Sequence, residues 1–412
     1  MDIWRFFVHT MGLGIQIFAS LLGIYQTLLS FPGYFPAKKP HTHSPEKKFA
    51  ILIPAHNEER VIGFLLDSLF AQDYPSHLYD IHVIADHCSD HTAEVALAHG
   101  AKVHCREQST QRSKGYAIEW MLKRLQEMSV SYDAVLIFDA DNLVEADFLQ
   151  AMNHHLCTGH RVIQGYLGVK NPFDSWVTVS QAVSYWFSNC MWQKARNNLG
   201  LACSLGGTGV CVDFNLLAEM GWHATGLAED LEFGVRCIRR GIYPVWAHEA
   251  RVYDEKPIDL VSSLRQRIRW MRGHFYCAKR NFFPLLSKAL QKRDVRQLDA
   301  ALYLFQPIRF MILFLISLMV FFHISISSDM GINHLSGLLP TYFWILISAI
   351  LYLQIPFALF LEKVNWRAYF ALPLLPIFLW TWGPITLYAF LSCSDQRWSH
   401  TEHKRSIRMD EL

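Results

Sequence analysis

The sequence predicts an α/β fold, with a Rossmann-like and mainly parallel sheet covered by helices, together with transmembrane α-helices. Three observations lead to this fold class. Short apolar runs alternate with amphipathic stretches between residues 49 and 138, as in βαβ units. Acidic side chains follow these runs directly, at the strand ends where open α/β sheets collect ligands. Four apolar stretches of about 20 residues flank this region, and that length suffices to cross a bilayer.

Three strands and two helices are predicted in the first part of the chain. Residues 49–54, 81–85 and 134–138 are continuous apolar runs, which is the pattern of buried parallel strands. A helix opens at residues 56–59 after the first strand, and a second covers residues 93–99 after the next. The residues that follow each strand should therefore meet at one edge of the sheet.

Two further helices are expected downstream. Residues 176–199 are rich in aromatic side chains, which core packing or seating at a membrane interface explains more simply than contact with a ligand. Residues 282–298 mix Phe and Leu with Lys and Arg, as an interfacial helix that leads into a membrane does.

Charge and cysteine content exclude several classes of protein. The net charge of +2 is small, and no stripe of Lys and Arg interleaves with aromatic residues, so no nucleic-acid partner is expected. The nine cysteines are scattered, odd in number and never spaced as C-x-x-C, which argues against a disulfide framework and against a zinc site. We therefore expect reduced thiols.

The first apolar stretch, residues 11–31, favours a membrane anchor over a signal peptide, because no small-residue cleavage site follows it. Only Arg5 carries positive charge before this stretch, whereas four lysines follow it: Lys38, Lys39, Lys47 and Lys48. This asymmetry predicts that the following domain lies in the cytoplasm and that the protein is a multi-pass protein of the cell (inner) membrane.

The other candidate spans are residues 304–324, 339–361 and 369–391. Counting them puts the C-terminus outside, whereas the basic tail favours the cytoplasm. A break of the last stretch into a re-entrant hairpin would reconcile the two, and that stretch contains three prolines: Pro373, Pro376 and Pro384. Between three and five spans are expected.

Four polar signatures follow one another along the chain. Asp86 ends the second predicted strand, and Asp139-Ala140-Asp141 follows the third. Glu229-Asp230 opens an amphipathic segment, and Gln266-Arg267-Ile268-Arg269-Trp270 comes after it. In this order they resemble the D, DxD, ED and QxxRW motifs of processive family 2 glycosyltransferases, such as cellulose, chitin, hyaluronan and poly-N-acetylglucosamine synthases. The resemblance extends by motif over residues 49–275.

This resemblance implies a GT-A fold and an inverting hexosyltransferase. The donor would be a nucleotide-diphospho sugar, with UDP-glucose or UDP-N-acetylglucosamine expected, and the acceptor a growing β-linked polysaccharide whose synthesis is coupled to export through the bilayer. A single transfer to a lipid acceptor, as in ceramide glucosyltransferases, is the alternative, and product length separates the two. A catalytically idle scaffold is disfavoured, because every expected acidic position is filled.

The predicted organisation has five parts. They are an N-terminal transmembrane anchor (1–35), a cytoplasmic GT-A domain (45–280), an interfacial amphipathic segment (281–300), C-terminal transmembrane helices (301–392) and a basic tail (393–412).

Asp139 and Asp141 are the predicted metal ligands. At alternating positions of a strand end their side chains point to the same side, and carboxylates suit Mg²⁺ or Mn²⁺ bound to a diphosphate. The alternative, a solvated acidic turn, is less favoured at the end of a strand. His248 and Asp254-Glu255 are interpreted as a surface histidine and an acidic turn, with a contact to metal or product as the alternative.

The resemblance also assigns residues to the donor. Asp86 would contact the nucleotide base, and Lys114 and Arg269 the diphosphate, where Arg269 can pair bidentately. The remaining donor contacts are expected from Pro54, Asn57, Glu58 and Asp139. The alternative for Asp86 is that it caps, with Asp90, the helix that starts near Thr92.

By resemblance, Asp230 is the general base, with Glu229 beside it. An inverting transfer needs a carboxylate within hydrogen-bond reach of the acceptor hydroxyl. The alternative, a carboxylate placed for the helix dipole, is compatible with this role. Gln266, Trp270 and Gly207 are the predicted acceptor contacts, because the Trp270 ring offers a face for a sugar and Gly207 lies in a tight loop.

Overall fold

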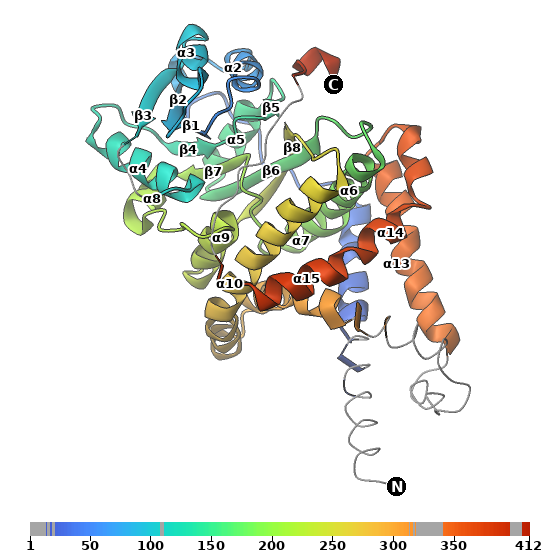
Figure 1. The fold of residues 1–412 in the computed structure, drawn as a ribbon. Coiled ribbons are helices and arrows are strands. Elements are labelled where there is room, and N and C mark those ends of the chain that lie inside the picture. The colour runs from blue at the N-terminus through green and yellow to red at the C-terminus, as the bar shows by residue number, and fades with distance from the viewer. Residues whose placement is uncertain are drawn as a thin grey trace.

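The computed structural model describes residues 14, 17–18, 21–107, 111–312, 314–315, 318, 341–395 and 406–412. One eight-stranded sheet with helices on both faces forms its centre (Figure 1). The strand order is β3-β2-β1-β4-β7-β6-β8-β5. The strands are β1 (Phe49–Ala55), β2 (Tyr79–Asp86), β3 (Lys102–Arg106), β4 (Ala134–Ile137), β5 (Leu143–Val144), β6 (Val162–Val169), β7 (Val210–Asp213) and β8 (Val245–Asp254).

The first half of the sheet is parallel and contains the predicted strands. β1 pairs in parallel with β2 and β4, and β2 pairs in parallel with β3. The strands predicted at residues 49–54, 81–85 and 134–138 are confirmed as β1, β2 and β4. Nearly all of their residues are buried, because helices cover both faces, as a continuous apolar run predicts.

The second half of the sheet is mixed. β7 runs antiparallel to both β4 and β6, and β5 runs antiparallel to β8. β6 and β8 are parallel, with a shift of register between Gly165 and Tyr166. The prediction of a mainly parallel α/β sheet is therefore confirmed, and the antiparallel pairs belong to this half.

Helices form one layer on each face of the sheet (Figure 1). Alternate residues of a strand point to opposite faces, so Ile51 packs in the core of one layer and Leu52 in that of the other. The first layer contains α2 (Ile62–Phe70), α3 (Thr92–Ala98) and α5 (Phe148–Cys157). The second contains α4 (Lys114–Glu127), α8 (Phe214–Met220) and α9 (Glu229–Arg239). The predicted helices after the first two strands correspond to α2 and α3.

The aromatic-rich segment 176–199 is helical throughout, as predicted. It consists of α6 (Trp176–Ser188), the π-helical turn η3 (Asn189–Lys194) and α7 (Ala195–Leu199). Ser175 begins it as an N-cap, because its side chain accepts hydrogen bonds from the backbone N–H groups of Val177 and Thr178.

The predicted interfacial segment 281–300 comprises two helices instead of one. α10 (Leu260–Lys292) continues through residue 281, and α11 (Val295–Leu304) follows it. α10 continues because its buried face does, at steps of four residues: Gly273, Cys277, Asn281, Leu285 and Ala289. Arg293 ends it with a φ of 52°, and the Asp294 side chain caps α11.

The apolar ends of the chain are helical where they are described. Within the described residues, none of the helices combines the length and the apolarity that crossing a bilayer requires. The predicted spans at residues 11–31, 304–324 and 339–361 each extend outside the described residues. Residues 369–391 are broken near their prolines. The helices of this end are α13 (Thr341–Leu361), η5 (Trp366–Ala371), α14 (Leu375–Trp380) and α15 (Trp382–Leu391).

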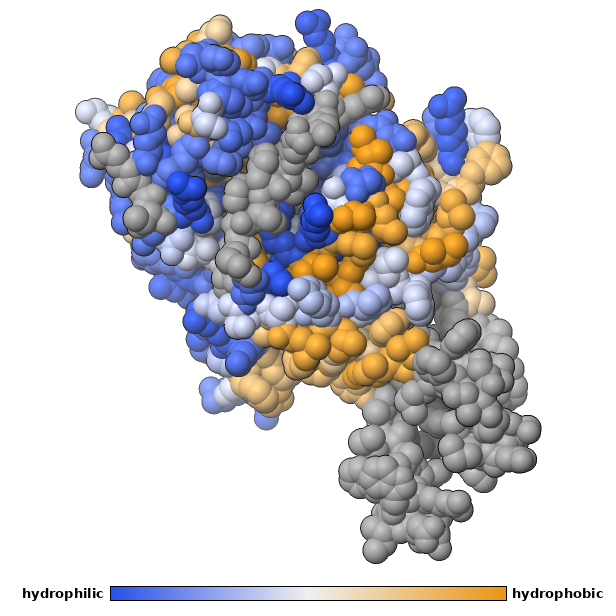
Figure 2. Space-filling view, in the orientation of Figure 1, coloured by the Kyte–Doolittle hydropathy of each residue, from blue (hydrophilic) through white to orange (hydrophobic). Residues whose placement is uncertain are grey.

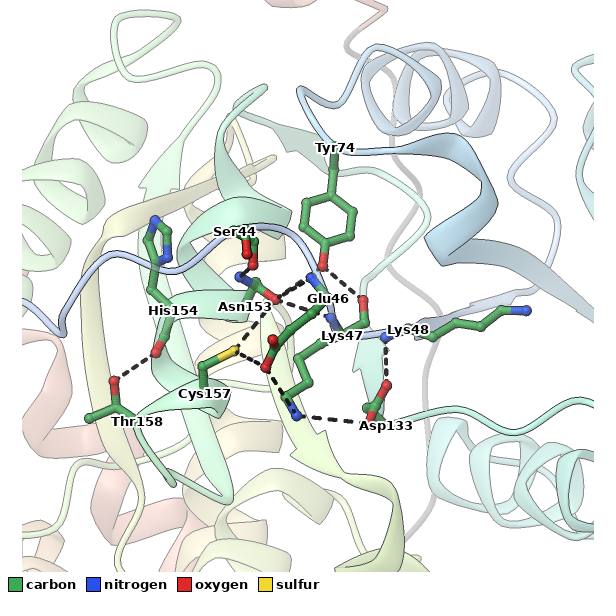
Figure 3. Close-up of polar contacts among 10 residues, drawn as sticks. All are labelled: Ser44, Glu46, Lys47, Lys48, Tyr74, Asp133, Asn153, His154, Cys157 and Thr158. Atoms are coloured by element: carbon green, nitrogen blue, oxygen red, sulfur yellow. Dashed lines mark hydrogen bonds and ion pairs between the residues drawn. The ribbon is translucent and has the colours of Figure 1, made fainter.

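The backbone of the segment before β1 is tied to α5 by hydrogen bonds to the Asn153 side chain (Figure 3). The buried Asn153 accepts from the N–H groups of Glu46 (3.2 Å) and Lys47 (3.1 Å) and donates to the carbonyl of Ser44 (2.9 Å). This side chain helps to fix the path of residues 44–47 just before the sheet. Three further 3₁₀ turns are described: η1 (Phe31–Tyr34), η2 (Ser76–Leu78) and η6 (Met409–Glu411).

Candidate active site

A cleft of about 860 Å³ opens where the carboxyl ends of β1, β2 and β4 face α9 and α10. It brings together side chains that are more than 200 residues apart in the sequence, such as Pro54 and Trp270, and strand ends that meet at one edge of a sheet predict this placement. The predicted site residues that line it are Pro54, Glu58, Asp86, Lys114, Asp139, Asp141, Gly207, Glu229, Asp230, Gln266, Arg269 and Trp270.

Asn57 is the predicted site residue that does not line the cleft. Its Oδ1 accepts a hydrogen bond from the Ser89 N–H at 2.8 Å, so it joins the loop after β1 to the loop after β2. Both loops contain a residue in the left-handed region, since φ is 58° at Asn57 and 54° at His87. Such conformations are uncommon for residues other than glycine and cluster at functional sites.

Asp86 is held from two sides at the end of β2. Arg106 Nη1 donates to its Oδ1 at 2.6 Å, and His87 Nδ1 lies 2.8 Å from the same oxygen. The side chain of Arg106 is 4% exposed, so this pair is largely removed from water. Asp86 is therefore a fixed acceptor at the cleft wall and not a helix cap. The side chain that accepts from the Thr92 N–H is Asp90.

Lys114 joins three elements at the centre of the cleft. Its Nζ lies 2.5 Å from Asp139 Oδ1, donates to the Gly207 carbonyl at 2.6 Å and lies 3.7 Å from Glu229 Oε1. Burial disfavours the charge of this ammonium, but Asp139, Glu229 and Asp230 outweigh burial and raise its pKa. Lys114 is therefore a firm cation where the resemblance expects a diphosphate.

Asp230, the second residue of α9, has a carboxyl group with a shifted pKa. Desolvation raises its pKa to about 7, and the neighbouring Glu229 adds to the rise, while the Leu231 N–H and Lys114 oppose it. Gly207 faces this carboxylate, because a side chain at that position would come within 3.5 Å of Asp230 Oδ2. With φ at 81°, that backbone also favours glycine. The missing side chain at Gly207 leaves space beside the Asp230 carboxylate. A base with a pKa near neutral in such a position suits proton transfer from an acceptor hydroxyl.

α10 contributes the QxxRW side chains to the opposite wall. Gln266 Oε1 is buried and has no hydrogen-bond partner among the described residues. Arg269 forms no salt bridge within the described part of the chain. Burial lowers the pKa of its guanidinium, and the carboxylates of the cleft offset this lowering only in part. Buried polar groups are normally paired, so an unpaired carbonyl and an unpaired guanidinium in a cleft are groups that a ligand can satisfy.

The carboxylates of the cleft fit a divalent cation together with a diphosphate. Asp139, Asp141 and Asp254 line the same cleft, and Asp254 Oδ1 is buried without a hydrogen-bond partner among the described residues. Burial, with help from Asp141 and Asp139, raises the pKa of Asp254 to about 6. No three acidic, His or Cys side chains of the described residues are already arranged around one point. That is compatible with Mg²⁺ or Mn²⁺, which takes most ligands from phosphates and water.

The end of β8 holds candidate site residues that the motifs do not include. Asp254 lines the cleft and is more than part of an ordinary acidic turn. Lys256 Nζ lies 2.6 Å from Asp254 Oδ2, 3.6 Å from the centre of the Tyr185 ring and 5.9 Å from that of Trp270. Lys256 thus connects the acidic side of the cleft to its aromatic side. The sequence contains one signal for this role. Asp254 lies at the end of a strand, as Asp139 lies just after one.

Comparison with known families agrees with this geometry. The family described as Glycosyltransferase like family 2 matches residues 45–273. The chain is 24% identical over 332 residues to YdaM, a probable glycosyltransferase of Bacillus subtilis (strain 168). That alignment covers 77% of this chain and 75% of YdaM. It is 27% identical over 247 residues to the beta-monoglucosyldiacylglycerol synthase of Trichormus variabilis. That alignment covers 55% of this chain and 48% of the relative, or about half its length.

Among solved structures, the chain is similar to the mannosyltransferase PcManGT of Pyrobaculum calidifontis, determined with GDP-Man and Mn²⁺. The TM-score is 0.54, and the alignment covers 93% of this chain and 98% of that one. At 13% identity this likeness shows the fold alone, and it extends beyond the catalytic domain to the flanking helices.

Proposed function

The chain belongs to glycosyltransferase-like family 2 and is a nucleotide-sugar glycosyltransferase, and from this premise we propose that it is an inverting enzyme of the membrane surface. In this proposal it transfers a hexosyl group from a UDP-linked sugar to a growing β-linked polysaccharide. The observation that carries the proposal is Asp230, a carboxyl group with a pKa near 7 that shares a cleft with Lys114, Arg269 and Asp141.

Asp230 acts as the general base in this reaction. Its carboxylate accepts the proton of the acceptor hydroxyl while that oxygen bonds to the anomeric carbon. The bond from the anomeric carbon to the diphosphate breaks on the opposite face, and its electron pair leaves with the nucleotide. The anomeric configuration is therefore inverted, and an α-linked donor yields a β-linked product.

Lys114 and Arg269 stabilise the departing diphosphate from two walls of the cleft. Both cations line the cleft, where fixed positive charges stabilise the negative charge that develops on the leaving diphosphate better than mobile water does. Asp141, with Asp139 and Asp254 nearby, would hold Mg²⁺ or Mn²⁺, which supplies further neutralisation of the phosphate charge. Asp86 and the loop of Pro54 and Glu58 would bind the nucleoside.

An apolar surface supports placement at a bilayer. Figure 2 shows hydrophobic residues gathered on the side where Figure 1 places α13 to α15, away from the hydrophilic helices around β1 to β3. Nine large side chains of this end are each at least 54% exposed: Leu353, Phe357, Phe360, Trp366, Phe370, Ile377, Trp380, Tyr388 and Leu391. Such a surface is a membrane or protein contact. We place it at the inner membrane with the catalytic domain in the cytoplasm. Labelling of a Thr42→Cys variant from outside intact cells, above the wild-type level, would contradict this orientation.

The acceptor end of the cleft supports a saccharide first and a lipid second. Tyr185, Trp270 and Tyr303 line it, and aromatic faces suit the apolar faces of sugars. Aliphatic side chains share this end, which favours a lipid acceptor as the second candidate: Leu167, Leu205, Leu227, Leu231 and Met271. The diacylglycerol-glucosylating relative from Trichormus variabilis supports the same alternative.

One experiment tests the donor and separates the acceptors. The full-length protein in lipid nanodiscs is incubated with Mn²⁺ and a panel of UDP- and GDP-sugars, while nucleotide release and product size are measured. The proposal expects release from one UDP-hexose and a long polysaccharide product. If a lipid with a single sugar is the product at every donor concentration, the acceptor is a lipid and not a polysaccharide. Absence of release with every donor contradicts the proposed reaction itself.

A further inference from the structure

Arg267 lies inside the QxxRW segment but does not line the cleft. Neighbouring positions of a helix are rotated by about 100° from one another, so Arg267 points away from the wall that Gln266 and Trp270 form. It is 0% exposed and packs under the C-terminal helices α14 and α15. Figure 1 shows α15 crossing beside α10, and the two helices are in contact.

The contacts of Arg267 meet at the junction between α14 and α15. Nη1 donates to Thr381 Oγ1 at 2.8 Å, and Thr381 is the residue between the two helices. The guanidinium lies 4.3 Å from the centre of the Phe378 ring, near the end of α14, and 5.2 Å from that of Trp382, the first residue of α15. Nε donates to the Ser263 carbonyl one turn earlier in α10, at 3.3 Å.

Burying the charge of Arg267 costs free energy unless other groups stabilise it. Burial lowers the pKa of Arg267 to about 10, so the side chain remains charged at neutral pH. Its Nη2 has no hydrogen-bond partner among the described residues, and no carboxylate of the described residues contributes to its pKa. The two aromatic faces and the Thr381 hydroxyl stabilise the charge, and only a planar guanidinium can use all three at once.

The partner helices face outward with apolar side chains. Ile377 is 60% exposed and Trp380 is 55% exposed, on the surface that the proposed function places at the bilayer. A second contact joins the same elements, because Arg272 Nε donates to Ser392 Oγ at 2.9 Å just after α15. α10 is thus fastened at two points to helices whose other side is apolar and exposed.

We propose that Arg267 is a positioning residue, which fixes α10 against the α14–α15 junction so that membrane seating of that junction sets the acceptor wall of the cleft. Gln266, Arg269 and Trp270 then hold their places relative to Asp230 because Arg267 anchors the same helical turn from behind. This inference rests on the proposed function for its membrane surface and its acceptor wall. The loops that bind the nucleoside follow β1 and β2 and, with Lys114, do not depend on the anchor. Arg269 does depend on it, but it acts on charge that develops as the diphosphate departs, so its displacement lowers turnover more than UDP binding.

Arg267→Lys and Thr381→Val test the anchor in nanodiscs. Lys keeps the charge but lacks the planar fork, and Val keeps the shape of Thr while removing the hydrogen-bond acceptor. Arg265→Lys is the matched control, since Arg265 is exposed on the same helix. Three quantities are measured: binding of UDP with Mn²⁺, amide hydrogen exchange of α10, and turnover measured as UDP release with the donor that the wild type uses.

Both test variants should bind UDP with Mn²⁺ within about twofold of the wild type, while turnover falls by about 10-fold or more, because small misplacements of reacting groups cost that much. Exchange should rise in residues 263–271 and in α15 but not in β1 or β2. Arg265→Lys should match the wild type throughout. Wild-type exchange in Arg267→Lys, or equal loss of nucleotide binding and turnover, overturns the inference. The hydrogen-exchange result tests the anchor even if no donor supports turnover. Absence of turnover with every donor would contradict the proposed function but not the anchor.

Discussion

The nucleotide side and the transfer side of the cleft differ in how their polar groups are paired. On the nucleotide side, Asp86 already pairs with Arg106, and Lys114 with Asp139. On the transfer side, Gln266 Oε1 and Asp254 Oδ1 are buried without hydrogen-bond partners among the described residues. Leaving such groups unpaired costs stability. The difference indicates that the nucleotide side is organised in advance, whereas the transfer side is completed by its ligands.

The largest expected effect is on the transfer side, at Asp230. Asp230→Asn keeps the shape but removes the base, so turnover should fall by roughly 10²–10⁴-fold. Binding of UDP with Mn²⁺ should stay within about twofold, because proton abstraction belongs to the transition state. Calorimetry and nucleotide release measure the two quantities. Equal loss of both would remove the distinction between the sides.

A smaller effect is expected at the metal site between the two sides. Asp141→Asn removes the charge of one oxygen ligand, so activity should fall by roughly 100-fold, and more Mn²⁺ should be needed for half-maximal rate. The fold should persist, which circular dichroism can check. EDTA should abolish the activity of the wild type, and full activity in EDTA would exclude the metal.

The smallest of the three effects is expected at Trp270. Trp270→Ala removes a stacking face worth about 1–2 kcal/mol, so kcat/KM for the acceptor should fall by roughly 10-fold. The KM for the donor sugar should not change, because the nucleotide loops lie on the other side. A rise in the KM for the donor, without a change in kcat/KM for the acceptor, would show that Trp270 belongs to the nucleotide side instead.

The same division separates what the sequence predicts from what it does not. β1, β2 and β4 are continuous apolar runs because helices cover both of their faces, and the motifs that follow them belong to the nucleotide side. β6 contains Gly165, Gly168 and a shift of register, and β8 mixes Trp and Val with charged residues. Neither has the continuous apolar pattern of a buried parallel strand, so the mixed half of the sheet is not evident from the sequence.

The site follows a similar rule. Residues within a motif, such as Asp139, Asp230 and Trp270, are identified by their order along the chain. Arg106 and Lys256 are not, because each acts through a partner that only the folded chain brings near, Asp86 for one and Asp254 for the other. The direction in which Arg267 points likewise depends on α14 and α15.

The pH dependence of kcat/KM for the acceptor, measured at saturating donor and Mn²⁺ between about pH 5 and 8, tests most directly whether Asp230 is the base. A base must be ionised to accept a proton, and desolvation raises the pKa of Asp230 to about 7. We therefore predict that kcat/KM falls as the pH decreases through about 7 and that the residual activity of Asp230→Asn lacks this dependence. A flat wild-type profile, or the same profile in Asp230→Asn, would contradict the account.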